Sequence, residues 1–110
     1  MLRHPKALKD LSPAELASRL DAGDSLRLVD VRRPYEYRRG HIAAAASVPL
    51  GSERRSLRDL PRETPVVLIC LSGHRSQVAA ANLLEMGFGD VSHLDGGMLA
   101  WWRARLPVSR

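Results

Sequence analysis

The chain contains one cysteine, Cys70, and the residues around it suggest a chemical role. Cys70 ends the apolar run that begins at Val66, and the loop Leu71-Ser72-Gly73-His74 then leads into Arg75 and a second apolar stretch. Such a loop can turn its backbone N–H groups inward to bind an anion, while a helix start and a guanidinium add positive charge. These features favour the thiolate, which is the nucleophilic form of cysteine. The pattern therefore predicts a reactive cysteine in an anion-binding loop.

A packing role is the alternative for Cys70, because free cysteine is among the residue types most often buried. A packing cysteine needs neither a flexible loop nor a cationic helix start, so the segment Gly73-His74-Arg75-Ser76 favours the reactive interpretation. A single cysteine also excludes an internal disulfide, a multi-cysteine zinc site and a redox pair of cysteines.

The rest of the sequence predicts the elements that position this loop. Helices are expected at 13–22, where Ser12 and Glu15 form a capping box, and at 52–60, 78–86 and 98–105. Strands are expected at 26–31, near Ser47-Val48, at 66–70 and at 91–94, and the segment 34–51 is otherwise interpreted as a turn. Strands that alternate with helices indicate an α/β fold with a mostly parallel sheet. Cys70 then lies at the carboxyl end of a buried strand, where ligands bind in such sheets.

Composition limits the class of protein. The 110 residues, 45% hydrophobic and 26% charged, are typical of one globular domain. No apolar run approaches the roughly 20 residues of a membrane span, and the first residues do not resemble a secretion signal, so we expect a cytoplasmic protein with no membrane partner. The net charge of +5 comes from scattered arginines, with few aromatic residues among them. This pattern argues against nucleic-acid binding.

Four sequence blocks, in order, resemble the signature of the single-domain rhodanese family. They are Leu28-Val29-Asp30-Val31-Arg32, then Tyr35-Glu36 with Gly40-His41-Ile42, then the strand that runs into Cys70-Leu71-Ser72-Gly73-His74-Arg75-Ser76, and finally Leu94-Asp95-Gly96-Gly97 with Ala100-Trp101. The resemblance implies one rhodanese-like α/β domain over 1–110, with its core at about 7–105. It also implies a five-stranded, mostly parallel sheet flanked by helices.

The resemblance further implies a thiosulfate sulfurtransferase-like enzyme in which Cys70 is catalytic. Cys70 would take sulfane sulfur from thiosulfate or another small anionic donor, hold it as a persulfide, and pass it to cyanide or to a protein or small-molecule thiol. The N–H groups of Leu71, Ser72, Gly73, His74, Arg75 and Ser76 would bind the persulfide, and no metal or organic cofactor would be needed. Asp30 and Arg32 would support the loop, with Asp30 acting through Arg75.

Two other functions stay open at this point. Thiosulfate-using members often have a basic or polar residue directly after the cysteine, where this chain has Leu71, so a non-catalytic or protein-fed sulfur-carrier or regulatory module is the main alternative. A phosphatase or arsenate-reducing enzyme is disfavoured. Four residues separate Cys70 from Arg75, whereas cysteine phosphatases have five, and the chain has no second cysteine.

Overall fold

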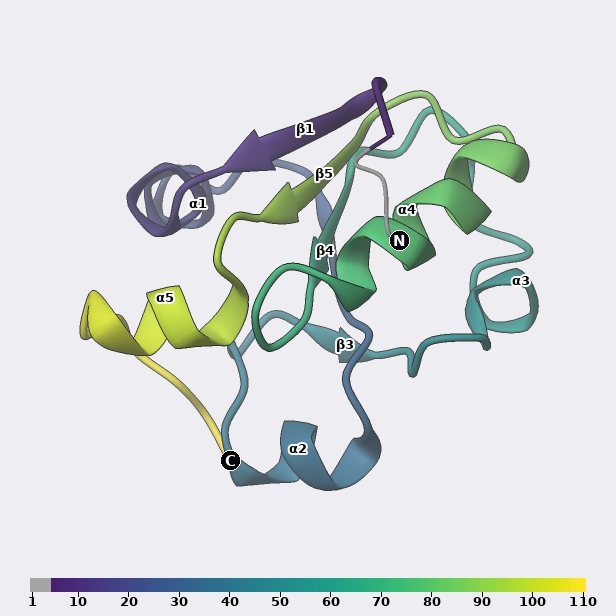
Figure 1. Ribbon diagram of the computed structural model, residues 1–110. Coiled ribbons are helices and arrows are strands. Elements are labelled where there is room, and N and C mark those ends of the chain that lie inside the picture. The colour runs from purple at the N-terminus through teal and green to yellow at the C-terminus, as the bar shows by residue number, and fades with distance from the viewer. Residues whose placement is uncertain (1–4) are drawn as a thin grey trace.

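Five short strands form one sheet, in the order β1-β5-β4-β2-β3, in the computed structural model, which describes residues 5–110 (Figure 1). The strands are β1 (Leu8–Leu11), β2 (Arg27–Asp30), β3 (Ala46–Ser47), β4 (Val66–Ile69) and β5 (Val91–Leu94). Every pair of neighbouring strands is parallel. The predicted α/β class with a mostly parallel, five-stranded sheet is therefore confirmed.

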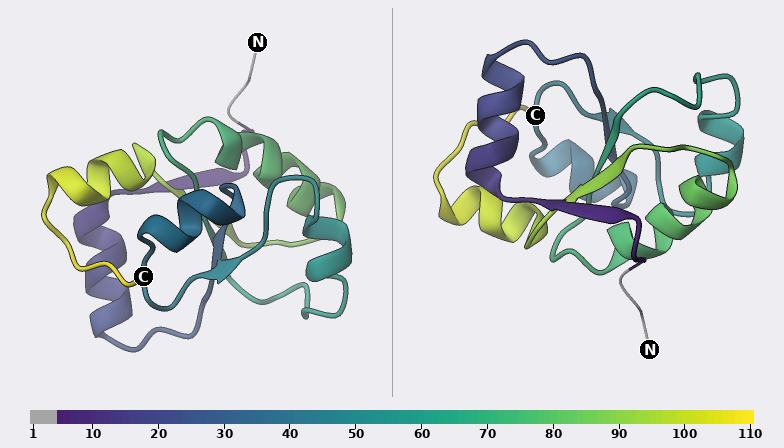
Figure 2. Two further views of the ribbon diagram at one scale, coloured as in Figure 1. Left: turned by 90° about the horizontal axis from the view of Figure 1, so that it is seen from below. Right: turned by 90° about the horizontal axis from the view of Figure 1, so that it is seen from above.

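Helices cover both faces of this sheet. They are α1 (Pro13–Asp21), α2 (Pro34–Arg39), α3 (Glu53–Ser56), α4 (Arg75–Glu85) and α5 (Gly97–Arg103). Helices α1 and α5 lie on one face, and α3 and α4 lie on the other (Figure 2). Helix α2 lies below the sheet in Figure 1, on the side toward which β4 runs. The elements that follow the strands thus bring α2, the start of α4 and the start of α5 to one end of the sheet.

Strand β4 is buried on both faces because its side chains alternate between two hydrophobic cores. The core on the α4 side contains Val66, Leu68 and Cys70 with Ala79, Ala80 and Leu83. The core on the other face contains Val67 and Ile69 with Leu16, Met98 and Trp101. Burying each larger apolar side chain contributes roughly 1.5–3 kcal/mol. Cys70 therefore follows directly on a strand that is buried on both faces.

Most of the predicted elements are confirmed. Helix α1 begins with the predicted capping box, in which Glu15 N donates to Ser12 Oγ (3.1 Å) and Ser12 N donates to Glu15 Oε1 (2.9 Å). The strand at 91–94 matches β5, and the strand at 66–70 differs from β4 by one residue. Helix α4 begins three residues before the predicted start, so that Arg75 and Ser76 belong to its first turn.

Two elements were not predicted from the sequence. Strand β1 lies at the edge of the sheet and only Leu8 of its residues is buried, so it has no apolar run. Helix α2 lies within the segment expected to be a turn, and the interpretation of that segment was wrong. None of the α2 residues is buried, so no apolar periodicity marks it. Its remaining signals are Pro34 at the first helical position and Glu36, whose carboxylate accepts the Arg33 N–H (3.1 Å).

The predicted surface helix over 52–60 was also wrong in its length and character. Helix α3 ends at Ser56, and the Arg62 guanidinium donates to carbonyls of the turn that follows, among them Leu60 O (2.7 Å). Glu53 is buried rather than exposed. Its carboxylate accepts from the Gly51 N–H and from Asn82 Nδ2, so it fixes α3 against α4.

Candidate functional site

Cys70 directly follows β4 and begins the loop that leads into α4. It is 1% exposed. The N–H of Gly73 donates to Cys70 Sγ at 3.0 Å. Gly73 also has φ +97°, a conformation that glycine adopts without strain and that other residues rarely adopt. The backbone therefore supplies a hydrogen-bond donor to the sulfur before any ligand is bound.

The start of α5 is hydrogen-bonded to this loop. The N–H groups of Met98 and Leu99 donate to the carbonyl oxygens of Cys70 (2.9 Å) and Leu71 (3.0 Å). A Cβ at Gly97 would lie within 3 Å of both carbonyls, and Gly97 also has φ +60°. Only glycine allows this approach. Gly97 was named in the sequence only as part of the block Leu94-Asp95-Gly96-Gly97, and its contact with the cysteine loop was not predicted.

Arg75, the first residue of α4, pairs with Glu36 of α2. Its Nη1 and Nη2 atoms donate to Glu36 Oε1 (2.6 Å) and Oε2 (2.9 Å), a two-bond arrangement typical of strong guanidinium–carboxylate pairs. These hydrogen bonds lower the pKa of Glu36 to about 2 and raise the pKa of Arg75. The hydrogen-bonded carboxylate partner of Arg75 is thus Glu36, and not Asp30 as the sequence analysis suggested.

Asp30 and Arg32 form a buried pair at the end of β2. Both side chains are 1% exposed or less, and Arg32 Nη2 donates to Asp30 Oδ2 and to the carbonyl of Gly40, each at 2.8 Å. Gly40 directly follows α2, so this pair holds the segment that carries Glu36. Asp30 and Arg32 are therefore connected to the cysteine loop through α2 and the pair of Glu36 with Arg75.

The remaining loop residues differ in exposure. Leu71 is half-buried and packs against the core on the α5 side. Ser72 and His74 are exposed, with Ser72 Oγ 3.2 Å from His74 Nδ1. Ser76 is buried, and its Oγ lies 3.5 Å from Cys70 Sγ as the acceptor of the thiol proton. Two side chains of the predicted site, Cys70 and Ser76, thus meet in the interior, and the others lie at the surface or in supporting contacts.

Two residues next to this site were missed by the sequence analysis. His93 of β5 is buried, and its Nδ1 lies 2.7 Å from Ser76 Oγ. Its Nε2 lies 2.7 Å from Asp10 Oδ1 on β1. The available signal was a histidine within a strand whose four residues are all buried, since a buried polar side chain needs a partner.

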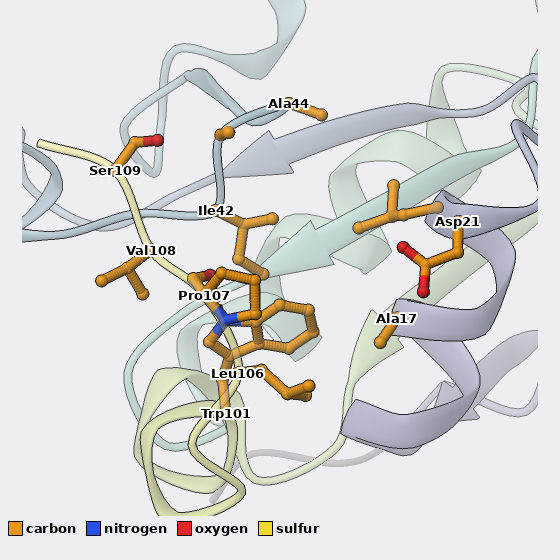
Figure 3. Close-up of a pocket in the computed structure, with 11 residues that line it drawn as sticks. Ala17, Asp21, Ile42, Ala44, Trp101, Leu106, Pro107, Val108 and Ser109 are labelled. Atoms are coloured by element: carbon orange, nitrogen blue, oxygen red, sulfur yellow. Dashed lines mark hydrogen bonds between the residues drawn. The ribbon is translucent and has the colours of Figure 1, made fainter.

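A hollow on the surface lies apart from the cysteine loop. Ile42, Trp101, Leu106 and Pro107 line it, together with Ala17 of α1 (Figure 3). None of residues 70–76 contributes to it, and its lining is mostly apolar. Over residues 5–110, no cluster of acidic, histidine or cysteine side chains could hold a metal ion, and no helix is long and apolar enough to cross a membrane.

The parallel sheet thus places a buried cysteine at the carboxyl end of an inner strand, with a backbone N–H donating to its sulfur and a guanidinium at the start of the following helix. Residues 12–104 match the rhodanese-like domain, and the chain belongs to that family. This confirms the resemblance to single-domain rhodaneses found in the sequence.

Individual relatives agree with this assignment. The chain is 35% identical to a sulfurtransferase of Allochromatium vinosum over 92% of its own length and 94% of that protein. It is 34% identical to the thiosulfate sulfurtransferase GlpE of Pseudoalteromonas translucida, over 86% and 90% of the two chains. The solution structure of the rhodanese-like domain of the Anabaena protein Alr3790 is similar with a TM-score of 0.83 and 27% identity, covering 91% of this chain and 77% of that one.

Proposed function

We propose that the protein is a sulfurtransferase that carries sulfane sulfur as a persulfide on Cys70. The observation that supports this most directly is the Gly73 N–H, which donates to Cys70 Sγ at 3.0 Å within a loop that places four residues between Cys70 and Arg75. The similarity to proteins named sulfurtransferase and thiosulfate sulfurtransferase supports the same class of reaction.

The reaction with thiosulfate takes place in two displacement steps. In the first, the Cys70 thiolate attacks the outer sulfur of thiosulfate, a new S–S bond forms, and the S–S bond of thiosulfate breaks as sulfite leaves with its electron pair. In the second, cyanide or a thiolate attacks the outer sulfur of the persulfide. The Cys70 S–S bond breaks, the thiolate returns, and thiocyanate or a new persulfide departs.

The loop stabilises the negative charge that both steps place on sulfur. Backbone N–H groups fixed before the reaction stabilise an anion without reorganisation, and the start of α4 adds positive partial charge. Burial of Cys70 keeps water from the persulfide. The short loop suits one sulfur atom, whereas a phosphate with its three non-bridging oxygens needs a wider ring of donors.

Arg75 acts in this proposal mainly as a positioning residue. Its guanidinium is held by the Glu36 carboxylate, so the pair adds little net charge to the site. It fixes the start of α4, and with it the last amides of the loop, against α2. His74 is exposed at the mouth of the loop and can contact an incoming donor or acceptor.

The second candidate function is a carrier module that receives sulfur from a protein donor. Leu71 favours it, because this uncharged, half-buried side chain offers no attraction to thiosulfate directly after the cysteine. The two functions differ in rate. A thiosulfate enzyme forms thiocyanate with saturation kinetics, whereas a carrier is loaded quickly only from a persulfide held by another protein.

The test is the intact mass of the protein after brief incubation with thiosulfate, with and without later addition of cyanide. We expect wild type to gain one sulfur, about 32 Da, that cyanide removes, and Cys70→Ser to gain nothing. Ser92→Ala, a small change at another buried polar side chain, is the matched control and is expected to load like wild type. Sulfur on the Cys70→Ser protein, or no loading of wild type from thiosulfate or a protein persulfide, would refute the persulfide proposal.

A further inference from the structure

A chain of four polar side chains connects the reactive sulfur to the far edge of the sheet. Cys70 Sγ lies 3.5 Å from Ser76 Oγ, Ser76 Oγ lies 2.7 Å from His93 Nδ1, and His93 Nε2 lies 2.7 Å from Asp10 Oδ1. We call these four residues the relay. Three of them are buried, and only the Asp10 side chain, which is 54% exposed, reaches the surface.

The directions of these hydrogen bonds follow from what each group can donate. The Asp10 carboxylate only accepts, so His93 Nε2 carries a proton, and in a neutral imidazole Nδ1 is then an acceptor. The Ser76 hydroxyl donates to that nitrogen, its shorter contact, rather than to the Gly73 carbonyl at 3.2 Å. The Gly73 carbonyl already receives a hydrogen bond from Gln77 Nε2 (3.1 Å). Ser76 Oγ is thereby left as an acceptor for the Cys70 thiol.

We propose that His93 accepts the proton of the Cys70 thiol and that the Ser76 hydroxyl passes it between them. The Cys70 S–H bond breaks as an O–H bond forms at Ser76, while the original hydroxyl proton of Ser76 moves to His93 Nδ1. The products are a thiolate, a neutral hydroxyl and an imidazolium, so protons and charge balance. After the transfer the two hydrogen bonds of the Ser76 hydroxyl are reversed: His93 Nδ1 donates to Ser76 Oγ, and the Ser76 hydroxyl donates to the thiolate. His93 Nε2 still donates to Asp10 Oδ1.

The surroundings of His93 suit this role. Asp10 of β1 is the anion next to the imidazole, and it stabilises the imidazolium that the transfer creates. From α4 the imidazole contacts the uncharged Ser76, and from β4 its register partner is the apolar Leu68. Arg75, the cation at the start of α4, forms an ion pair with Glu36. His93 and Asp10 are therefore positioning residues that act on Cys70 through Ser76.

This inference deepens the proposed function, because it rests on Cys70 acting as a nucleophile. A buried thiol that must ionise has little direct access to bulk water, and the relay gives its proton a defined acceptor inside the protein. The same proton is then available when the acceptor takes the sulfur and the Cys70 thiolate returns to the thiol.

The test compares ionisation of Cys70 in wild type and relay variants. The ultraviolet absorbance of the thiolate, taken as the difference from Cys70→Ser, is followed against pH, together with the rate of alkylation by iodoacetamide. His93→Gln keeps a polar side chain but cannot take up the thiol proton. Asp10→Asn keeps an oxygen that can accept from His93 Nε2 but removes the negative charge beside the imidazole. Ser76→Ala deletes the oxygen that passes the proton. We expect each change to move the midpoint of thiolate formation to higher pH, and His93→Gln and Ser76→Ala to slow alkylation at neutral pH on the order of tenfold or more.

The pair of Lys9 with Asp90 provides the matched control. It also joins β1 to the residue before β5, with Lys9 Nζ and Asp90 Oδ1 2.8 Å apart, and successive side chains of a strand such as Lys9 and Asp10 point to opposite faces of the sheet. Asp90→Asn is therefore expected to leave the thiolate midpoint unchanged. The double variant Ser76→Ala with His93→Gln is expected to behave like either single variant, because the two residues act as one unit.

Different experimental results would overturn the relay and the proposed function. Unchanged thiolate midpoints in folded Ser76→Ala and His93→Gln, or additive effects in the double variant, would overturn the relay while wild type still loads sulfur. A role of His93 in stability alone would lower the melting temperature and leave the midpoint in place. Should His93→Gln not fold, Ser76→Ala decides the question by itself, since it removes one atom. A relay-dependent thiolate that never accepts sulfur would overturn the proposed function and leave the relay intact.

Discussion

Arg75 and Glu36 join the first turn of α4 to α2 through two parallel hydrogen bonds of 2.6 and 2.9 Å. The two residues are 39 positions apart in the sequence, and α2 makes few other contacts with α4. The orientation of the cysteine loop against α2 therefore depends on this pair, and both ends of the pair can be varied.

Glu36→Gln is expected to lower both sulfur transfer and stability at neutral pH. The pKa of Glu36 is lowered from its usual 4.5 to about 2, so its folded-state pKa lies below its unfolded-state pKa. The stabilisation is then fully present above about pH 4.5 and is lost as the pH falls toward 2. Urea unfolding of wild type and Glu36→Gln between pH 7 and pH 3 should show a difference that narrows below pH 4.5. A difference that stays constant down to pH 3 would contradict this account.

Gly97→Ala is expected to displace the backbone of the cysteine loop. The added Cβ would approach the carbonyls of Cys70 and Leu71, and the positive φ adds strain, so we expect a loss of about 1–3 kcal/mol in the free energy of unfolding and a marked fall in sulfur loading. Gly89→Ala is the control, because nothing lies within 4 Å of a Cβ at that position. Equal stability and loading of the two variants would show that the close approach at Gly97 is not needed.

Asp30→Asn is expected to be the most destabilising of the changes near the site. It leaves the buried guanidinium of Arg32 without its charged partner, and breaking such a pair typically costs about 3–5 kcal/mol. Asp24→Asn breaks the exposed pair with Arg19 and should change the free energy of unfolding by less than about 1 kcal/mol. Chemical denaturation of both variants measures the difference, and similar values for the two would contradict a structural role for the buried pair.

Leu71→Lys is expected to lower KM for thiosulfate with little effect on kcat. The long aliphatic part of lysine can occupy the half-buried site of Leu71 while the ammonium reaches solvent beside the loop. Leu71→Met keeps the packing without the charge and should behave like wild type. Initial rates of thiocyanate formation over a range of thiosulfate concentrations measure both constants. An unchanged KM in Leu71→Lys would show that charge at this position does not limit donor binding.

The sequence predicted the parts of the fold that depend on strong local patterns. The β-branched run of β4, the capping box at Ser12 and the loop from Cys70 into α4 are all visible as residue types at fixed spacings. Strand β1 and helix α2 carry no apolar pattern, because one lies at an edge and the other buries none of its residues. Their positions depend on tertiary contacts, which a single sequence does not display.

The same distinction applies to the site. Cys70 and its loop are contiguous in the sequence and could be recognised there. Asp10 and His93 are 83 positions apart and meet only because β1 and β5 are neighbours in the sheet, with these two residues in register. Glu36 was identified within a motif, but its pairing with Arg75 depends on the helix that the sequence analysis missed.

The contacts between α5 and the loop make the direction of the loop amides independent of the loop side chains. In a planar trans peptide the C=O and the following N–H point in opposite directions. Because the Met98 and Leu99 amides hold the carbonyls of Cys70 and Leu71, they also direct the N–H groups of Leu71 and Ser72 away from α5. The direction of these amides thus depends on backbone contacts and on glycine at 97, and not on which side chains the loop carries. Leu71, Ser72 and His74 can therefore be exchanged to suit a different sulfur donor while these amides keep their direction.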